Sequence, residues 1–232
     1  MDAYHLSHRL QTVAGFVLSG SRLAEIGSDH AYLPAYLAMN KKIKWAIAGE
    51  VVTGPYQNAV HEIRQLHLEN LVATRQADGL AAIHVDEEID VVTICGMGGS
   101  LICQILTAGF DQLNKRPRLI LQPNVNEVAV RHWLIRNSYQ IVAEEIVAED
   151  RHIYEIIVAD PIKEPITLTT IEYLFGPLLL QAKSPAFIQK WQGEKLKLQR
   201  VLAQLTQAQN EPVAKEQELQ QKIKLIEEIL ND

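Results

Sequence analysis

Acidic residues close three successive apolar segments in the first half of the chain. The first segment ends in the string Glu25-Ile26-Gly27-Ser28-Asp29-His30, the second ends at Glu50, and the third ends at Asp78-Gly79. Ligands of an open parallel sheet bind beyond the carboxyl ends of its strands, near the point where the strand order reverses. If the three segments are neighbouring strands, their terminal carboxylates line one ligand site.

The spacing and charge of these residues favour a nucleoside ligand without phosphate. Glu50 lies about 20 residues after Gly27, where a carboxylate can hold the two adjacent hydroxyls of a ribose. The stretch lacks the G-x-G-x-x-G series that binds a pyrophosphate, and Asp29 puts negative charge where a phosphate would lie. S-adenosylmethionine, a nucleoside with a cationic centre, fits this charge, and Asp78 is placed to accept a hydrogen bond from its adenine amino group.

Strand and helix patterns alternate between residues 4 and 136. Apolar, β-branched runs predict strands at 22–27, 44–52, 71–77, 89–95 and 118–122, and helical periodicity is clearest at 4–19, 55–66 and 126–136. The strand segments are continuously apolar, which is typical of parallel strands covered on both faces. The fourth strand runs into the glycine-rich string Gly96-Met97-Gly98-Gly99.

The pattern changes after residue 138. Segments 139–149 and 152–159 are separated only by Asp150 and Arg151, which predicts an antiparallel hairpin. From residue 184 onward two leucine-rich seams predict a helical coiled-coil hairpin that is interrupted at Asn210-Glu211-Pro212. We therefore expect an α/β fold with two domains: a Rossmann-like parallel sheet with a terminal antiparallel hairpin at 1–160, and a helical domain at 161–232.

The composition is that of an ordinary globular protein, with 47% apolar and 22% charged residues. The 2 cysteines show no metal-site spacing, so neither a structural metal nor a disulfide framework is predicted. No apolar run approaches the roughly 18 residues of a membrane span, and the first residues lack the apolar segment of a signal peptide. We expect a cytosolic protein without membrane contact.

The net charge of −6 argues mildly against a protein that binds polyanions over its whole surface. Two basic stripes are nevertheless candidates for contact with a nucleic-acid backbone. They comprise Lys115, Arg116 and Arg118 in the first part of the chain, and Lys190, Lys195, Lys197 and Arg200 in the helical tail.

Each of these residue types also has a purely structural interpretation. Glu50 and Asp78 can be helix caps or turn formers, and the glycine-rich string can be a tight turn with close helix packing. Arg9, His30 and Tyr32 can cap or pack, and a basic stripe is often a solvated helix face. The joint occurrence of carboxylates at three strand ends favours the ligand site. The cofactor-binding candidates are Glu25, Gly27, Asp29, His30, Glu50, Asp78, Gly79 and Gly96.

Several strings carry a resemblance to one family. They are EIGSDHAYLP at 25–34, AGEV at 48–51, ADGL at 77–80, ICGMGG at 94–99 and LQPN at 121–124. With them the chain resembles the TrmK family, bacterial tRNA adenine-N1 methyltransferases that act at position 22, over essentially its whole length. The resemblance implies a class I methyltransferase domain with a C-terminal coiled coil, S-adenosylmethionine as methyl donor and tRNA as substrate.

The reaction can also be argued from its chemistry. Adenine N1 carries a lone pair at neutral pH, so it can attack a sulfonium methyl group without a strong general base. The product is a cation, which a carboxylate close to N1 would stabilise. Asp29 is our candidate for this role, although it could equally contact only the cofactor. Arg9 and Tyr32 are weaker candidates for holding the nucleotide, by a phosphate contact and by stacking.

Access to a base in folded tRNA requires its extrusion, at a cost of a few kcal/mol. The basic stripe of the tail is a candidate clamp on the tRNA backbone, assisted by the first stripe. We expect a monomer without an obligate protein partner. Three alternatives remain at this level: the same fold acting on another substrate, a non-catalytic RNA-binding module that senses the cofactor, and, least favoured, an NAD-dependent dehydrogenase.

Overall fold

The computed structural model describes residues 1–207 and 213–231. The chain forms two compact units, Met1–Leu180 and Gln181–Asp232. Within the described ranges, no helix is long and apolar enough to cross a membrane, and no group of three or more His, Cys, Asp or Glu side chains is arranged to hold a metal ion.

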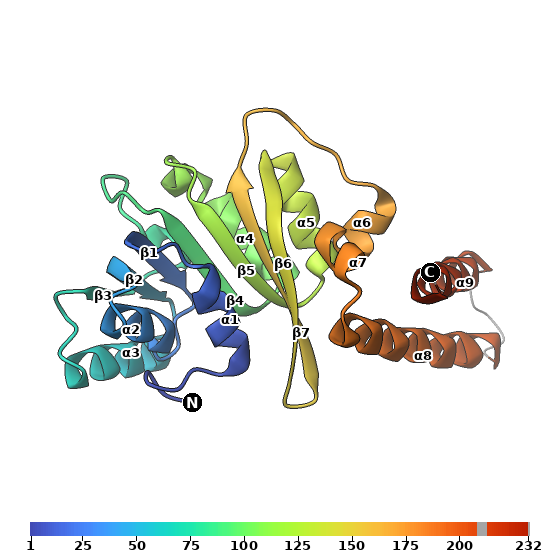
Figure 1. Cartoon of the computed structure of the whole chain (residues 1–232), viewed down its shortest axis with the longest axis horizontal. Helices are drawn as coiled ribbons and strands as arrows, with labels where there is room; N and C mark the ends of the chain where they lie inside the picture. The colour runs from blue at the N-terminus through green and yellow to red at the C-terminus, as the bar shows by residue number, and fades with distance from the viewer. Residues whose placement is uncertain (208–212, 232) are drawn as a thin grey trace. The chain divides into compact units, whose positions relative to one another are not determined.

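The first unit is built on a seven-stranded sheet with the order β3-β2-β1-β4-β5-β7-β6 (Figure 1). Strands β1 to β5 are parallel, and β7 is antiparallel to both of its neighbours. The strand order reverses between β1 and β4, because the chain first moves outward through β2 and β3 and then crosses back. The strands are β1 (Ser21–Ile26), β2 (Ile43–Glu50), β3 (Val72–Gln76), β4 (Val91–Gly98), β5 (Arg118–Val125), β6 (Tyr139–Glu149) and β7 (His152–Pro161).

Helices cover both faces of this sheet. One core cluster contains side chains of α1 (His8–Phe16), α2 (Tyr32–Met39) and α3 (Thr53–Gln65), and the other contains side chains of α4 (Gly99–Ala108) and α5 (Glu127–Arg136), together with η1 (Gly79–Ala82) and η2 (Phe110–Leu113). Consecutive strand residues alternate between the two clusters, as Leu23 and Ala24 do in β1. The predicted fold is confirmed, and burial of both faces explains the continuously apolar strands.

The first helix is shorter than the predicted range 4–19. It begins at His8, because the Ser7 side chain accepts a hydrogen bond from the N–H of Leu10 and caps it. Before Ser7, the carboxylate of Asp2 accepts the N–H groups of Tyr4 and His5, which holds that segment in a turn.

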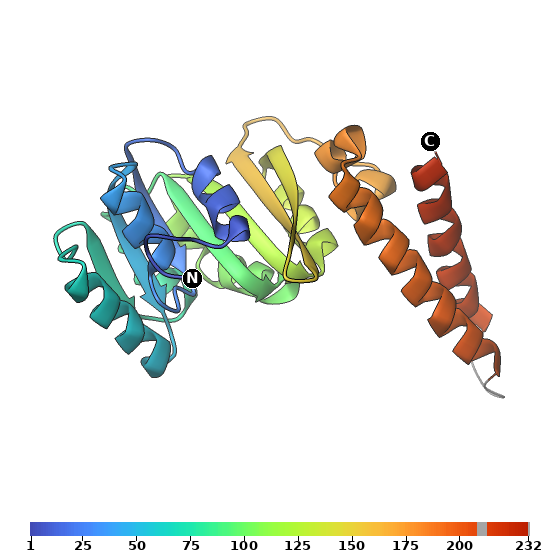
Figure 2. The same ribbon diagram turned by 60° about the horizontal axis from the view of Figure 1, so that its bottom comes forward.

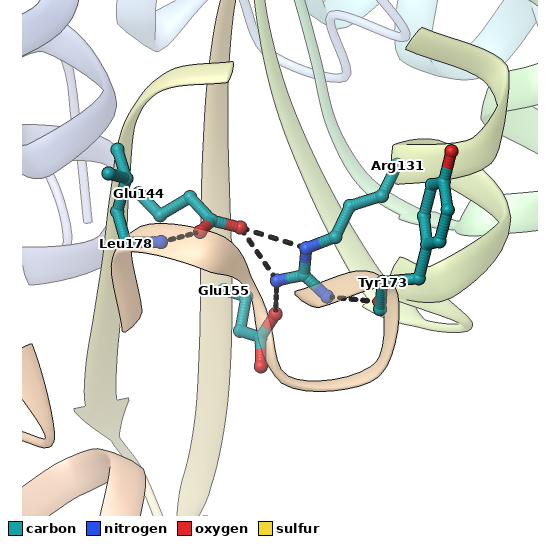
Figure 3. A network of polar contacts seen from close by, with 5 residues as sticks. All are labelled: Arg131, Glu144, Glu155, Tyr173 and Leu178. Atoms are coloured by element: carbon teal, nitrogen blue, oxygen red, sulfur yellow. Dashed lines mark hydrogen bonds and ion pairs between the residues drawn. The ribbon is translucent and has the colours of Figure 1, made fainter. Parts of the chain in front are cut away.

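Arg131 of α5 is the centre of a buried polar network (Figure 3). Its guanidinium forms ion pairs with Glu144 of β6, at 2.8 Å, and with Glu155 of β7, at 2.5 Å, and all three side chains are fully buried. The same guanidinium donates to the carbonyl of Tyr173 in α6 (Thr170–Phe175) at 3.3 Å. The Glu144 carboxylate accepts the N–H of Leu178 in α7 (Pro177–Ala182) at 2.9 Å. The network therefore binds α6 and α7 to the sheet.

This network explains where the first compact unit ends. The division lies after Leu180, whereas the sequence pattern placed the boundary at residue 160. The segment between them contains α6 and α7, whose backbone groups complete the coordination of Arg131 and Glu144. Gly176, with φ of +87°, lets the chain pass close to these groups, since a Cβ there would lie 2.6 Å from the guanidinium and 2.7 Å from the carboxylate.

The second unit contains α8 (Pro185–Gln207) and α9 (Val213–Asn231), drawn in orange to red in Figure 2. The two helices pack against each other, and Leu219, Ile223 and Ile226 of α9 are buried. Lys195 of α8 lies 3.6 Å from Glu227 of α9. The predicted helical hairpin is confirmed, and the predicted interruption at 210–212 falls outside the described residues.

Replacing Arg131 by Ala should lower the free energy of unfolding by about 3–5 kcal/mol, because two buried carboxylates lose their cation. Urea denaturation of the full chain, followed by circular dichroism, measures this change. Arg136→Ala, an exposed arginine of the same helix, is the matched control and should change stability by no more than about 0.5 kcal/mol. Equal losses for the two variants would contradict a stabilising role of the network.

Candidate functional site

A tight turn at the carboxyl end of β1 forms the floor of the candidate site. The N–H groups of Gly27 and Ser28 both donate to the carbonyl oxygen of Gly49 in β2, at 2.9 and 3.0 Å. Gly27 has φ of +79°, and a Cβ at this position would collide with the Met97 side chain. Glycine is therefore required by the left-handed conformation and by the space that the Met97 side chain occupies.

Glu25 lies beneath this turn and is buried. Its carboxylate accepts a hydrogen bond from the hydroxyl of Ser28. Burial raises the pKa of Glu25 to about 7, although the Ser28 hydrogen bond and the charge of Arg9 act in the opposite direction, and the nearby Glu50 adds to the rise. The structure thus places Glu25 as a support of the turn rather than on its open side.

Glu50 ends β2, which pairs with β1, and Asp78 follows the end of β3, on the other side of β2. One Glu50 oxygen accepts the N–H of Val52 at 2.8 Å, so part of this carboxylate has the structural role of a turn former. Asp78 precedes η1 as its N-cap residue, but its side chain makes no capping hydrogen bond and is exposed. The next residue, Gly79, has φ of +53°. The capping interpretation therefore fails for Asp78, which is open to a ligand.

Asp29 and His30 lie just before α2, and Tyr32 is its first residue. The Asp29 carboxylate is 66% exposed and lies 3.5 Å from His30 Nε2. The His30 ring stacks on Tyr32 with centroids 4.9 Å apart and planes at 7°. Burial raises the pKa of Tyr32 above its usual value, and the charges of Glu62, Asp2 and Asp29 add to this rise. Asp29 is thus a solvent-facing anion beside a stacked pair of rings.

A second polar cluster occupies the carboxyl ends of β4 and β5. The buried Gln122 side-chain oxygen accepts hydrogen bonds from the guanidinium of Arg9 and, at 3.0 Å, from the N–H of Gly96. The Gln122 amide nitrogen donates to Asn124 Oδ1 at 3.0 Å, and Asn124 Nδ2 donates to the Gly96 carbonyl at 2.8 Å. The Arg9 guanidinium also lies over the Tyr154 ring, 5.2 Å from its centroid. We call Arg9, Gly96, Gln122, Asn124 and Tyr154 the amide cluster.

The amide cluster changes two expectations. Arg9 was expected to contact an RNA phosphate, but its guanidinium is engaged with Gln122 and Tyr154. Gln122 and Asn124 received no role from the sequence, although they are polar residues at the end of a strand that is otherwise apolar. That break in the apolar pattern is the signal from which they could have been found.

The first basic stripe lies at the amino ends of the strands, opposite the end that carries the candidate site. Lys115 forms an exposed ion pair with Glu88, and Arg116 donates to two backbone carbonyls. Arg118 begins β5 and binds Asp160 with two hydrogen bonds of 2.7 and 2.6 Å. Because β1 and β5 are parallel strands of one sheet, these cations stand at their amino ends, away from the site. These three cations are therefore not part of the candidate site.

The second basic stripe runs along α8 and is partly engaged within the helical unit. Lys195 pairs with Glu227 of α9, and Lys190 lies 5.7 Å from the ring centroid of Trp191. Lys197 is 76% exposed, with Glu194 at 3.9 Å, and Arg200 is exposed. Lys197 and Arg200 are the most accessible members of this stripe.

Comparison with known proteins decides the family. The model of the family described as "TrmK: tRNA (adenine(22)-N(1))-methyltransferase" matches residues 23–228. The chain belongs to the TrmK family. The tRNA (adenine(22)-N(1))-methyltransferase of Bacillus subtilis (strain 168) is 40% identical over 238 residues, which cover 100% of this chain and 99% of that protein.

Solved structures of the TrmK family agree with this assignment. A putative tRNA (m1A22) methyltransferase of Streptococcus pneumoniae in complex with S-adenosyl-L-methionine superposes with a TM-score of 0.89 at 43% identity, covering 97% of this chain and 100% of that one. TrmK of M. capricolum in complex with S-adenosyl-homocysteine gives 0.85 at 30% identity, covering 97% and 98%. The family resemblance predicted from the sequence is confirmed.

The raised pKa of Glu25 predicts a pH-dependent stability. An unfolded glutamate titrates at about 4.3, whereas folded Glu25 titrates at about 7. Between these values the folded protein keeps a proton that the unfolded chain has released, so this group makes the free energy of unfolding fall as the pH rises, until it levels off above pH 7.

Glu25→Gln removes this titration, so the variant should lose about 3 kcal/mol less stability than the parent between pH 4.5 and 7. Urea denaturation at both pH values measures the difference. Glu145→Gln, an exposed glutamate of β6, is the control and should follow the parent protein. Parallel stability curves for all three proteins would show that Glu25 does not titrate in this window.

Proposed function

We propose that this protein transfers the methyl group of S-adenosylmethionine to N1 of adenine 22 in tRNA. The observation that carries the proposal is membership of the TrmK family over nearly the whole chain. The relative solved in complex with S-adenosyl-L-methionine supports the choice of methyl donor. The geometry of the site supports it independently.

The residues at the strand ends fit this cofactor. Glu50 has one oxygen bound to the Val52 N–H and a second oxygen that can accept from ribose hydroxyls. Asp78 can accept from the adenine amino group, since its carboxylate caps no helix. In the described ranges neither carboxylate is ion-paired, and Gly27 adds no side chain of its own at the end of β1. An acidic rim without a glycine-rich phosphate loop favours a sulfonium nucleoside over a dinucleotide.

Bound S-adenosylmethionine supplies an electrophilic methyl group on a sulfonium centre. The chain then has to present adenine N1 in line with that methyl group and to stabilise the positive charge that the base acquires. Asp29 provides an accessible carboxylate at the switch point of the sheet, where it can stabilise this charge electrostatically. The stacked His30–Tyr32 pair offers an aromatic surface beside it for a flipped base or its neighbour.

Unmodified tRNA incubated with labelled S-adenosylmethionine should gain one methyl group at N1 of adenine 22, mapped by mass spectrometry of nuclease fragments. Asp29→Asn should lower kcat by roughly 100-fold, as loss of a charge-stabilising group does elsewhere, while calorimetry gives an unchanged Kd for S-adenosylmethionine. Asp86→Asn, an exposed carboxylate in the loop before β4, is the control. Methylation at another nucleotide would overturn the proposal, and a raised Kd would make Asp29 a cofactor contact.

The tail contributes tRNA affinity through its accessible cations. Lys197 and Arg200 lie on the exposed surface of α8, where they can replace counterions along an RNA backbone. The double variant Lys197→Ala/Arg200→Ala should raise KM for tRNA and reduce the slope of log Kd against log salt by roughly 1 to 2.

Calorimetry with S-adenosylmethionine should give the same Kd for this double variant and the parent protein. Lys224→Ala removes an equally exposed cation from α9 and serves as the control. If Lys224→Ala weakens tRNA binding equally, the effect is one of overall charge and not of α8.

Two further properties belong to this proposal. The enzyme acts in the cytosol, where its substrate tRNA is, and it acts as a single chain. The side chains that a coiled-coil dimer would use, Leu219, Ile223 and Ile226, are already buried in one chain, which supports the monomer. Light scattering that gives the mass of two chains would refute the monomer. Recovery of the protein with membranes after cell fractionation would refute the cytosolic location.

A further inference from the structure

The orientation of both side-chain amides in the amide cluster is fixed by backbone and guanidinium groups. Arg9 and the N–H of Gly96 can only donate, so the Gln122 atom that they share is its oxygen. The Gln122 nitrogen must then donate to the neighbouring atom of Asn124, which is therefore Oδ1. The Gly96 carbonyl can only accept, so it takes a hydrogen bond from Asn124 Nδ2. Every assignment is consistent with the next.

This chain of hydrogen bonds leaves Asn124 with a defined outer edge. Oδ1 uses one lone pair for Gln122, and Nδ2 uses one hydrogen for Gly96. The second lone pair of Oδ1 and the second hydrogen of Nδ2 have no partner among the described residues, and they lie in the plane of an exposed side-chain amide. The edge lies at the carboxyl end of β5, next to β4 and the switch point, and thus on the same edge of the sheet as Asp29 and Glu50.

An acceptor beside a donor in one plane matches one edge of adenine and not that of guanine. Adenine presents the N6 amino donor and the N7 acceptor on its Hoogsteen edge, and an asparagine amide binds this pair with two hydrogen bonds. Guanine presents two acceptors, O6 and N7, at the same positions. An asparagine bound to N6 and N7 leaves N1 unobstructed, which is the atom that must face the methyl group.

We propose that Asn124 selects the target base by binding the Hoogsteen edge of adenine 22 through N6 and N7, with Gln122 as the positioning residue that fixes its amide. This inference rests on the proposed function and adds the edge by which the base is held. Arg9 acts through Gln122, since its guanidinium holds the Gln122 oxygen in place. Specificity for adenine thus follows from a relay of hydrogen bonds that begins on α1.

The test uses tRNA that carries 7-deazaadenosine at position 22, in which a C–H group replaces the N7 acceptor. The parent protein should lose roughly 10-fold or more in kcat/KM on this substrate, the value of one good base contact. Loss of N7 makes the ring more electron-rich, so the intrinsic reactivity of N1 changes in the opposite direction. A decrease therefore reports on binding geometry.

Two variants locate the contact. Asn124→Ala should be roughly 10- to 100-fold slower on normal tRNA and should show no further loss on the 7-deaza substrate. Gln122→Glu can still accept from Arg9 and Gly96 but cannot donate to Asn124, so it should also abolish the discrimination between N7 and C–H. Calorimetry with S-adenosylmethionine confirms that each variant is folded and binds the cofactor.

Gln140→Ala, which removes an exposed amide at the amino end of β6, is the matched control and should keep the full discrimination. The inference is overturned if the parent methylates both substrates equally well, or if Asn124→Ala keeps the preference for N7. In either case methylation of normal tRNA at position 22 still supports the proposed function. If the parent does not methylate that position at all, the proposed function is wrong, and the inference is overturned with it.

Discussion

The carbonyl oxygen of Gly49 accepts two hydrogen bonds from the turn that follows β1, and the candidate site depends on this contact. It joins the carboxyl ends of β1 and β2 and forces the backbone at Gly27 into a left-handed conformation. Asp29 is thereby turned outward, while Glu25 is held beneath the turn with Ser28. A side chain at Gly27 would disturb both the outward position of Asp29 and the buried position of Glu25, which is why glycine is needed there.

Carboxylates of the same chemical type have different roles at this edge because their environments differ. Glu25 is buried, and its raised pKa shows the cost of ionising it away from water. Asp29 and Asp78 are exposed, so their charge is available to a ligand. Glu50 is also buried, and one of its oxygens accepts a hydrogen bond from the backbone. An acidic motif in a sequence therefore does not by itself show which of its members face the ligand.

Much of the fold could be predicted because periodicity depends on local chain geometry. Continuously apolar strands and their helices gave the architecture, and the hairpin of β6 and β7 followed from the short turn at Asp150. The end of the first compact unit at Leu180 could not be predicted, because the packing of α6 and α7 depends on Arg131 and Glu144, whose partners are distant in sequence. A single charged residue on an apolar helix face, such as Arg131, does not indicate in the sequence which residues it will contact.

The candidate site was predictable to a similar degree. Glu50 and Asp78 could be proposed from the sequence, because the carboxyl ends of parallel strands lie together at one end of the sheet. The partners of Arg9 could not, since the contact between α1 and Gln122 depends on how the helix crosses the sheet. The pairing of Arg118 with Asp160 could not be predicted either, since clustering of basic residues in the sequence does not indicate their partners.

Methylation of adenine N1 requires neither a strong base nor a covalent nucleophile, and the site is consistent with this requirement. Burial raises the pKa of the Cys95 thiol to about 12, so the thiol stays protonated at physiological pH. Catalysis is then a matter of orientation and of charge stabilisation in the transition state. Both demand well-held groups, and hydrogen bonds hold both amide atoms of Gln122 and Asn124 as well as the N–H groups of Gly27 and Ser28.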